Sequence, residues 1–442
     1  MITHAPRRGI LCAVIFCAAC MVYYHLGILI PRAEEVRAAQ GLGNGYSFGA
    51  DFYPIWLTSR ESLLHRRDPY SAETTREIQI GLFGRPLDIP DSPALRQYRA
   101  YAYPAFTNNL LAPLSFLSFS TARIVALLIL TAVTALNIVL WLSVLRLRAG
   151  PVALISLALL TFSSYAVLEG LFAEQMGLLV GFLLAASMAA LVKGRLFLSG
   201  SLLALTLIKP QMTILVAVYL LLWGFDQLRA RRAFLIGFFL LLAFLAAASL
   251  LVWPHWVPEW LQVMFGYRDY STPPLVVYLL GHFGRSLGSI VIGALLVMSV
   301  ALAWRMRRSS PASPAFALTV SLLFSVTAIT LLPGHAVYDH ILLLPGIILV
   351  GFSWRRFAVA SLPVRFIFWI TALAVFWQWI SAPVVIAIRP FVSRQLFLSV
   401  FLPLPIRTAA SVPFGIFALL GLMMWQETRT PTALRNEEVV NP

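Results

Sequence analysis

The sequence predicts an all-α polytopic membrane protein, and three observations lead to this fold class. Apolar residues make up 60% of the 442-residue chain, and its mean hydropathy is +0.84. Charged residues make up 12%, which is about half of the ~25% usual in soluble domains. Arginines and lysines occur in short clusters between long apolar runs, as in the positive-inside pattern of cytoplasmic loops.

The net charge of +15 would suggest nucleic-acid binding in a soluble chain, but the positions of the charges argue against a polyanionic partner. Few acidic residues share the segments that hold the basic clusters, so membrane topology accounts for the basic balance. We expect no nucleic-acid partner. The clusters are Arg7-Arg8, Arg146 and Arg148, Lys193 and Arg195, Arg229, Arg231 and Arg232, Arg305, Arg307 and Arg308, Arg355, Arg356 and Arg365, and Arg429.

The N-terminal run is longer than the ~7–15 apolar residues of a signal-peptide core, which predicts an uncleaved first helix that starts in the cytoplasm. All three cysteines, Cys12, Cys17 and Cys20, lie inside this run. Their spacing on one helix fits neither a disulfide framework nor a zinc site. We interpret them as small apolar side chains.

Thirteen apolar runs are candidates for membrane crossings, each of which takes about 20 residues. If all thirteen runs crossed the membrane, every basic cluster between the second run and the tail would lie outside. Removing 103–119, which holds two prolines and two asparagines, returns the clusters and both termini to the cytoplasm, and we expect that run to form a helix along the outer interface. The twelve remaining runs are 9–30, 122–145, 151–168, 174–192, 196–208, 211–225, 233–252, 286–304, 314–332, 339–353, 364–381 and 411–427.

These runs predict one integral-membrane domain, 1–428, followed by a disordered cytoplasmic tail, 429–442. Runs 196–208 and 211–225 are too short to span comfortably, and they meet at "IKPQ", which predicts two short helices that meet at the floor of a cavity. Three segments then face outside, namely 31–121, 253–285 and 381–410. The first is too long for a plain connector, which favours a functional loop with juxtamembrane helices.

Polar groups near the outer ends of the crossings are the candidate site residues, because removing them from water is costly. Topology assigns them all to the outer leaflet. They are Asp51, Tyr53, Arg60, Tyr101, Tyr103, Asn108, Glu174, Gln175, Lys209, Gln211, His335, Tyr338, Asp339 and His340.

Asp51 precedes a helical pattern whose Ile55, Trp56, Ser59 and Leu63 would lie on the membrane surface. A carboxylate held there suits a general base that takes a proton from an attacking hydroxyl. The alternative is that Asp51 caps this helix, for which aspartate is favoured. The two roles are not exclusive.

The other candidates also have two interpretations each. Lys209 suits a phosphate contact or a side chain that extends to the interface, and Glu174-Gln175 suits a polyhydroxylated ligand or a helix start. His335, Asp339 and His340 suggest a metal site, but no HExxH spacing supports one, and we expect no metal. Three tryptophans, Trp253, Trp256 and Trp260, favour an interfacial belt over a sugar-stacking surface.

Several motifs together resemble glycosyltransferase family 87, the polyprenyl-phosphate-dependent membrane transferases. The opening "DFYPIWLTSRESLLHRRDPYS" is similar to that family's Asp-Phe-Tyr start and Asp-Pro-Tyr end, and "YAYPAFTNNLLAPLSFLSF" to its Tyr-x-Tyr-Pro-Pro segment. The stretch from "EQMG" to "LIKPQ" is similar to its Gly-Gln-x-Asn…Lys-Pro segment, with a weaker likeness at "HAVYDHILLLP". This chain departs from the pattern at Ala105 for proline, Glu174 for glycine and Gly177 for asparagine.

The resemblance implies a GT-C-like bundle and inverting transfer of a hexose, with mannose among the candidates, from a polyprenyl-phosphate donor to a glycolipid or glycan acceptor. The reaction lies on the outer face of a bacterial-type plasma membrane and needs no cofactor or obligatory metal. By the same resemblance, Asp51 is the catalytic base, Lys209 contacts the donor phosphate, and Tyr103 and Gln175 lie near the donor. Topology adds Arg60 on the donor side. Acceptor-side or supporting candidates are Tyr53, Glu174, Gln211, His335, Tyr338, Asp339 and His340.

A transporter or a flippase of a lipid-linked saccharide is the alternative function. Transporters have inverted repeats with midplane sites on broken helices. The break at Lys209-Pro210 fits such a site, but the second half of the sequence has no matching break. The outer segment of about ninety residues has no evident use in a transporter.

Overall fold

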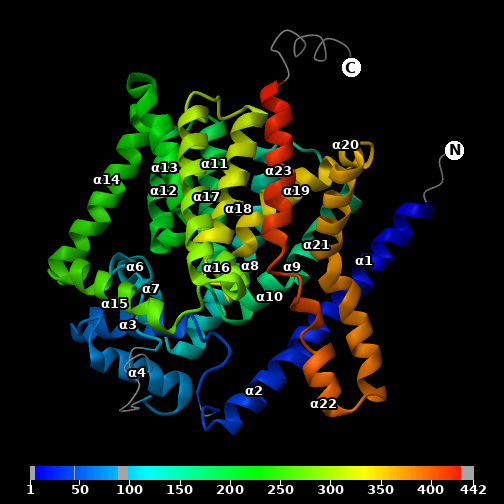
Figure 1. The fold of residues 1–442 in the computed structure, drawn as a ribbon. Coiled ribbons are helices and arrows are strands. Elements are labelled where there is room, and N and C mark those ends of the chain that lie inside the picture. Colours follow the sequence, from blue (N-terminus) through cyan, green and yellow to red (C-terminus); the bar gives the residue numbers. More distant parts are fainter. Residues whose placement is uncertain (1–4, 44, 88–97, 430–442) are drawn as a thin grey trace.

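The computed structural model describes residues 5–43, 45–87 and 98–429. This part of the chain is built from helices (Figure 1), which confirms the all-α prediction. The N-terminal helix is continuous through a π-helical segment, and the helices after it belong to the long outer segment. These elements are α1 (Ala5–Tyr24), η1 (His25–Leu29), α2 (Ile30–Ala39), α3 (Tyr53–His65), α4 (Ala72–Phe83), α6 (Phe106–Leu110) and α7 (Ala112–Ser115).

The bundle follows, and its first half runs from α8 to α14. These elements are α8 (Phe119–Val144), α9 (Pro151–Ser163), α10 (Tyr165–Phe172), α11 (Met176–Val192), α12 (Leu196–Leu205), η2 (Thr206–Ile208), α13 (Pro210–Asp226) and α14 (Leu228–Val252). The remaining elements are α15 (Trp256–Tyr270), α16 (Leu275–Leu280), η3 (Gly281–Phe283), α17 (Arg285–Met306), α18 (Pro314–Thr330), η4 (Val337–Leu343), α19 (Leu344–Phe352), α20 (Trp354–Ala358), α21 (Leu362–Ile388), η5 (Arg389–Phe391), α22 (Arg394–Leu396), η6 (Phe397–Phe401), η7 (Leu404–Ile406) and α23 (Val412–Arg429).

Several helices are long and apolar enough to cross a membrane, so the protein is an integral membrane protein. Within the described residues there are five such helices, or six if the bent pair α9–α10, whose axes meet at 56°, forms one span. The five are Gly9–Ala39, Phe119–Val144, Leu228–Val252, Ser286–Met306 and Leu362–Phe391.

The prediction of twelve crossings is not confirmed. Several predicted runs form apolar helices of only 10–17 residues, among them Met176–Val192 and Pro210–Asp226. At 1.5 Å per residue, 17 residues reach about 25 Å, which is less than the ~30 Å hydrocarbon core of a bilayer. The predicted tail lies outside the described residues, except that Arg429 ends α23.

The outer segment folds onto the lower end of the bundle, where α3, α4 and α15 lie across it in Figure 1. The run 103–119 forms the short helices α6 and α7 rather than one interfacial helix, and both pack against α3. Ile55 and Ser59 are fully buried. The prediction that this face of α3 lies on the membrane is therefore wrong, because α6 and α7 cover it.

The predicted break at the Lys209-Pro210 step is present. After α12, the chain tightens into η2, and Lys209 adopts non-helical angles (φ −136°, ψ 74°) before α13 starts at Pro210. Proline lacks the N–H that a continuous helix would need and fits the first turn of a new one. Lys209 is thereby placed between two helix ends, inside the protein.

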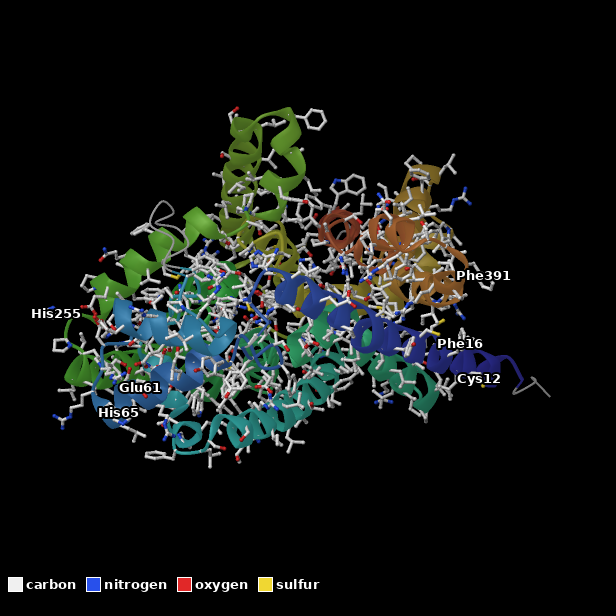
Figure 2. All side chains as sticks on the ribbon, turned by 90° about the horizontal axis from the view of Figure 1, so that it is seen from below. Cys12, Phe16, Glu61, His65, His255 and Phe391 are labelled. Carbon is white, nitrogen blue, oxygen red and sulfur yellow. The ribbon has the colours of Figure 1, made fainter. Side chains whose placement is uncertain are left out.

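Two apolar cores hold the bundle together. The larger core involves most of the helices, and the smaller joins α1 to α21 through Met21, Tyr24 and Trp379. The outer sides of these two helices expose apolar side chains such as Phe16 (60% exposed). Figure 2 shows Cys12 and Phe16 along α1, at the opposite end of the molecule from Glu61 and His65 of α3.

Candidate active site

A cavity of about 550 Å³ lies among the elements at the lower end of the bundle. Its walls come from segments that are far apart in the sequence: the loop before α3, residues 98–103, α10, the break between α12 and α13, α15, and the segment around η4. Of the predicted site residues, those that line it are Asp51, Tyr101, Tyr103, Gln175, Lys209, Gln211, His335 and Tyr338.

Asp51 is fixed by both its backbone and its side chain. Its N–H donates to the carbonyl of Ala173 at 3.0 Å, which ties the loop before α3 to the loop before α11. Its Oδ1 accepts from the guanidinium of Arg99, and its Oδ2 accepts from Nε2 of Gln175 at 2.5 Å. Phe52 occupies the cap position of α3 and makes no side-chain capping bond, so the helix-cap interpretation of Asp51 is wrong.

Lys209 forms the floor of the cavity. Its ammonium donates to Oδ1 of Asp339 at 2.6 Å and to Oε1 of Gln175 at 3.1 Å, and lies 5.0 Å from the ring centre of Tyr338. Lys209 is 7% exposed and Asp339 is 1% exposed. The interpretation of Lys209 as a side chain that extends to the interface is therefore wrong, because its charge is held inside the protein by a carboxylate.

These contacts form one continuous polar chain of five side chains. It runs from Arg99 through Asp51, Gln175 and Lys209 to Asp339. Each end of the chain is an ion pair, and the amide of Gln175 joins the two pairs. Gln175 is the cap residue before α11 but makes no side-chain capping bond there. Its two amide atoms instead link the carboxylate of Asp51 to the ammonium of Lys209, which sets the spacing between them.

Gly177 explains one departure from the expected motif. A Cβ atom at this position would lie 2.1 Å from Oδ1 of Asp339 and 3.5 Å from Nζ of Lys209. Any larger side chain would push Asp339 away from Lys209. The glycine is therefore matched to the buried Lys209–Asp339 pair of this chain.

His335 and Tyr338 also line the cavity. The Nδ1 of His335 lies 2.6 Å from Oγ1 of Thr272, and its backbone N–H donates to the same oxygen at 3.2 Å. Burial, followed by the charge of Arg99, lowers the pKa of His335. Both effects favour the neutral ring, which offers hydrogen bonds to the cavity.

The sequence model of glycosyltransferase family 87 matches residues 101–333, which is 233 of the 442 residues. The chain belongs to glycosyltransferase family 87. Membership implies glycosyltransferase activity at a membrane, with a sugar donor, an acceptor and a lipid bilayer as partners. The match includes Tyr103, Gln175 and Lys209 but begins after Asp51 and ends before His335. No curated protein and no solved structure matches the chain.

In this family 87 chain, some predicted residues do not reach the cavity. Arg60 donates to the carbonyl of Ser115 at 3.1 Å and lies over the ring of Trp56, because α3 turns it toward α7. Tyr53 is buried against Gly81 and Phe119, and Asn108 is buried behind Tyr101, whose hydroxyl donates to it at 2.6 Å.

The three residues that suggested a metal site point to different places. His335 contacts Thr272, Asp339 contacts Lys209, and His340 lines a separate apolar cavity. Among the described residues, no three His, Cys, Asp or Glu side chains gather closely enough to hold a metal ion. The tryptophans of 253–260 do not line the polar cavity either, and Trp260 donates to the carbonyl of Ala102 at 3.0 Å.

Two charged residues of the cavity escaped the sequence analysis. Arg99 lies in the long outer segment and has no motif around it. Glu169 of α10 lines the cavity and lies 3.6 Å from Nε2 of the buried His25. Of the two, only Glu169 could have been found from the sequence. A lone carboxylate beside an apolar run is costly to remove from water, which suggests a functional role.

Glu174 lies just outside the cavity, in the loop that carries Gln175. Its side chain is fully buried with no hydrogen-bond partner for either oxygen, and its backbone is left-handed (φ 54°). Burial raises the pKa of Glu174 to about 8, against a smaller opposing effect of Arg123. Between about 4.5, the ordinary value, and 8, the folded protein therefore holds a proton that the unfolded chain releases, so stability falls as pH rises.

Replacing this carboxyl with a neutral amide should remove that pH dependence. For Glu174→Gln, we expect stability relative to the wild type to increase by about 2 kcal/mol between pH 6 and pH 8, at 1.36 kcal/mol per pH unit. Thermal unfolding in detergent at the two pH values measures it, with Glu73→Gln, an exposed glutamate of α4, as the control. If the stability difference between Glu174→Gln and the wild type is the same at both pH values, Glu174 is ionised in the folded protein.

Proposed function

We propose that this family 87 protein transfers a hexose from a polyprenyl-phosphate sugar to a hydroxyl of a glycolipid or glycan acceptor, with inversion at the anomeric carbon. The single observation that carries the proposal is the polar chain from Arg99 to Asp339, in which Gln175 holds the carboxylate of Asp51 at the cavity wall and the ammonium of Lys209 at its floor. The proposed reaction needs a base and a cation that line the same cavity.

In the proposed reaction, Asp51 accepts the proton of the acceptor hydroxyl while that oxygen attacks the anomeric carbon. The bond between this carbon and the phosphate oxygen breaks, and the lipid phosphate leaves with the electron pair. Proton transfer by a positioned side chain speeds such steps, and fixed cations stabilise the charge that develops on the leaving group. Among the described residues, Lys209 and Arg99 are the cations that line the cavity, and Tyr103, Gln211 and Tyr338 offer hydrogen bonds to sugar hydroxyls.

An apolar cavity of about 470 Å³ supports a lipid-linked donor. It lies between α9, α10, η4, α19, α21 and α23, and Tyr165 lines both this cavity and the polar one. A donor whose phosphate and sugar occupy the polar cavity could therefore extend its isoprenoid chain past Tyr165 into apolar surroundings. Such a chain then stays in apolar surroundings when it passes from the bilayer into the protein.

The distribution of charge supports an extracytoplasmic site. The basic helix α20, with Arg355 and Arg356, and the end of α23 lie at the top of Figure 1, whereas α3, α10 and α15 lie at the bottom. Positive loops face the cytoplasm. We therefore propose that both termini are cytoplasmic and that the cavity faces outside in a bacterial-type plasma membrane.

A transfer assay tests the proposal. Membranes that contain the protein would receive labelled polyprenyl-phosphate hexoses with long and short isoprenoid chains, a nucleotide sugar and a glycolipid acceptor, with and without a chelator. We expect transfer from the long-chain lipid donor, reduced turnover of the short-chain donor, no use of the nucleotide sugar and no effect of the chelator. Movement of an intact lipid-linked saccharide across the membrane with no transfer would contradict the proposal and favour the flippase.

A further inference from the structure

The base proposed for the reaction is not free. Both carboxylate oxygens of Asp51 are engaged, Oδ1 by the guanidinium of Arg99 and Oδ2 by the amide of Gln175. A carboxylate that is to take a proton from a hydroxyl must offer an oxygen to it at hydrogen-bond distance. Each oxygen can still accept a second hydrogen bond, but it shares its negative charge with the donor already bound. Opening one contact therefore makes the carboxylate a stronger acceptor for the hydroxyl.

The two contacts differ in how readily they can open. Gln175 is 5% exposed and is held from the other side by Lys209, whose ammonium is shared with Asp339. The side chain of Arg99 is 36% exposed, and Asp51 is the carboxylate it contacts. Arg99 is thus the more accessible partner, and releasing it would leave the buried Lys209–Asp339 pair intact.

The guanidinium of Arg99 also has an unused donor. Its Nε is buried and makes no hydrogen bond, although an arginine presents five N–H donors in a fork that suits phosphate. Its backbone is left-handed (φ 66°), a conformation that costs energy in a non-glycine residue and collects at functional sites. An unfilled donor beside a cavity points to an anionic ligand.

We propose that Arg99 is a latch that exchanges the carboxylate of Asp51 for the phosphate of the lipid-linked donor. Without donor, Arg99 holds Oδ1 of Asp51 and keeps the base occupied. When the donor enters, its phosphate takes the guanidinium and frees Oδ1 for the acceptor hydroxyl, while Gln175 keeps Oδ2 in place. The latch rests on the proposed function and adds an order to it: the donor binds before Asp51 is released from Arg99.

Competition for one guanidinium gives the latch a thermodynamic signature. If Asp51 and the phosphate compete for Arg99, then neutralising Asp51 strengthens phosphate binding, and this gain depends on Arg99. A general electrostatic effect of removing a negative charge would instead persist without Arg99. A double-mutant cycle separates the two cases.

The experiment measures binding of a polyprenyl phosphate without sugar to the full-length protein in nanodiscs. We expect Asp51→Asn to tighten binding about tenfold, which is 1.4 kcal/mol, and Arg99→Ala to weaken it by a similar factor. In the double variant, the gain from Asp51→Asn should disappear. Arg99→Lys, which keeps the charge but loses the fork, should restore part of the affinity and confirm that the loss does not reflect misfolding. Arg85→Ala, an exposed arginine of the same outer segment, is the matched control and should bind as the wild type does.

The outcomes distinguish the latch from the function it rests on. The latch is overturned if Asp51→Asn tightens binding equally with and without Arg99, or if Arg99→Ala does not change binding. Either result leaves the transferase proposal standing. Failure of the wild type to bind the lipid phosphate overturns the donor class and the latch with it.

Discussion

Replacing Asp51 with asparagine should lower the rate of sugar transfer by a factor of about 10² to 10⁴, the usual contribution of a general base. Asparagine has nearly the same shape as aspartate but cannot accept the proton of the attacking hydroxyl. The turnover of labelled lipid donor by purified Asp51→Asn and wild-type protein measures the effect. Donor binding should survive, because the variant leaves Lys209 and Arg99 in the cavity.

The matched control for this variant is Glu73→Gln in α4, whose exposed carboxylate lies in the same outer segment but outside the cavity. It makes the same chemical change and should transfer sugar at the wild-type rate. A turnover of Asp51→Asn within a few-fold of that control would show that another group removes the proton. Glu169 would then be the next base to test, since it also lines the cavity.

Replacing Lys209 with methionine should have the largest effect on stability. The change leaves the carboxylate of Asp339 buried without a partner, and breaking one side of a buried ion pair costs about 3–5 kcal/mol. Thermal unfolding in detergent measures the loss. The double variant Lys209→Met/Asp339→Asn removes both charges and should recover most of the lost stability.

Activity separates the two roles of Lys209. Without its ammonium, Oε1 of Gln175 loses a donor and the cavity loses a cation, so the double variant should remain inactive although it is stable. Lys193→Met, at the exposed start of the loop after α11, should leave both properties unchanged. An active double variant would show that Lys209 serves the fold alone. An unstable double variant would show that the unpaired charge of Asp339 does not cause the stability loss of Lys209→Met.

Local chemistry explains which features could be predicted from the sequence. The break at Lys209 follows from Pro210, which cannot continue the preceding helix. Asp51, Gln175 and Lys209 could be assigned to one end of the bundle because apolar runs alternate in direction. The structure brings them together in one chain of hydrogen bonds, although their catalytic roles stay proposals.

Long-range packing explains what could not be predicted. Arg99 meets Asp51 across 48 positions of the chain, and nothing near Arg99 distinguishes it from the other arginines of that segment. Arg60 is turned from the cavity because α6 and α7 cover α3, which depends on tertiary contacts. The twelve crossings are not confirmed, because several of the apolar runs form helices of only 10–17 residues. Hydropathy measures how apolar a run is, whereas the length of its helix depends on where neighbouring segments end it.

The anomeric configuration of the product is the most direct test of the central claim, that Asp51 activates the acceptor for a single displacement in this cavity. The measurement is nuclear magnetic resonance of the glycoside made from a lipid donor of known configuration. The account predicts complete inversion, and loss of this product in Asp51→Asn. Retention of the donor configuration would contradict it, because retention requires a second displacement through a sugar bound to the enzyme.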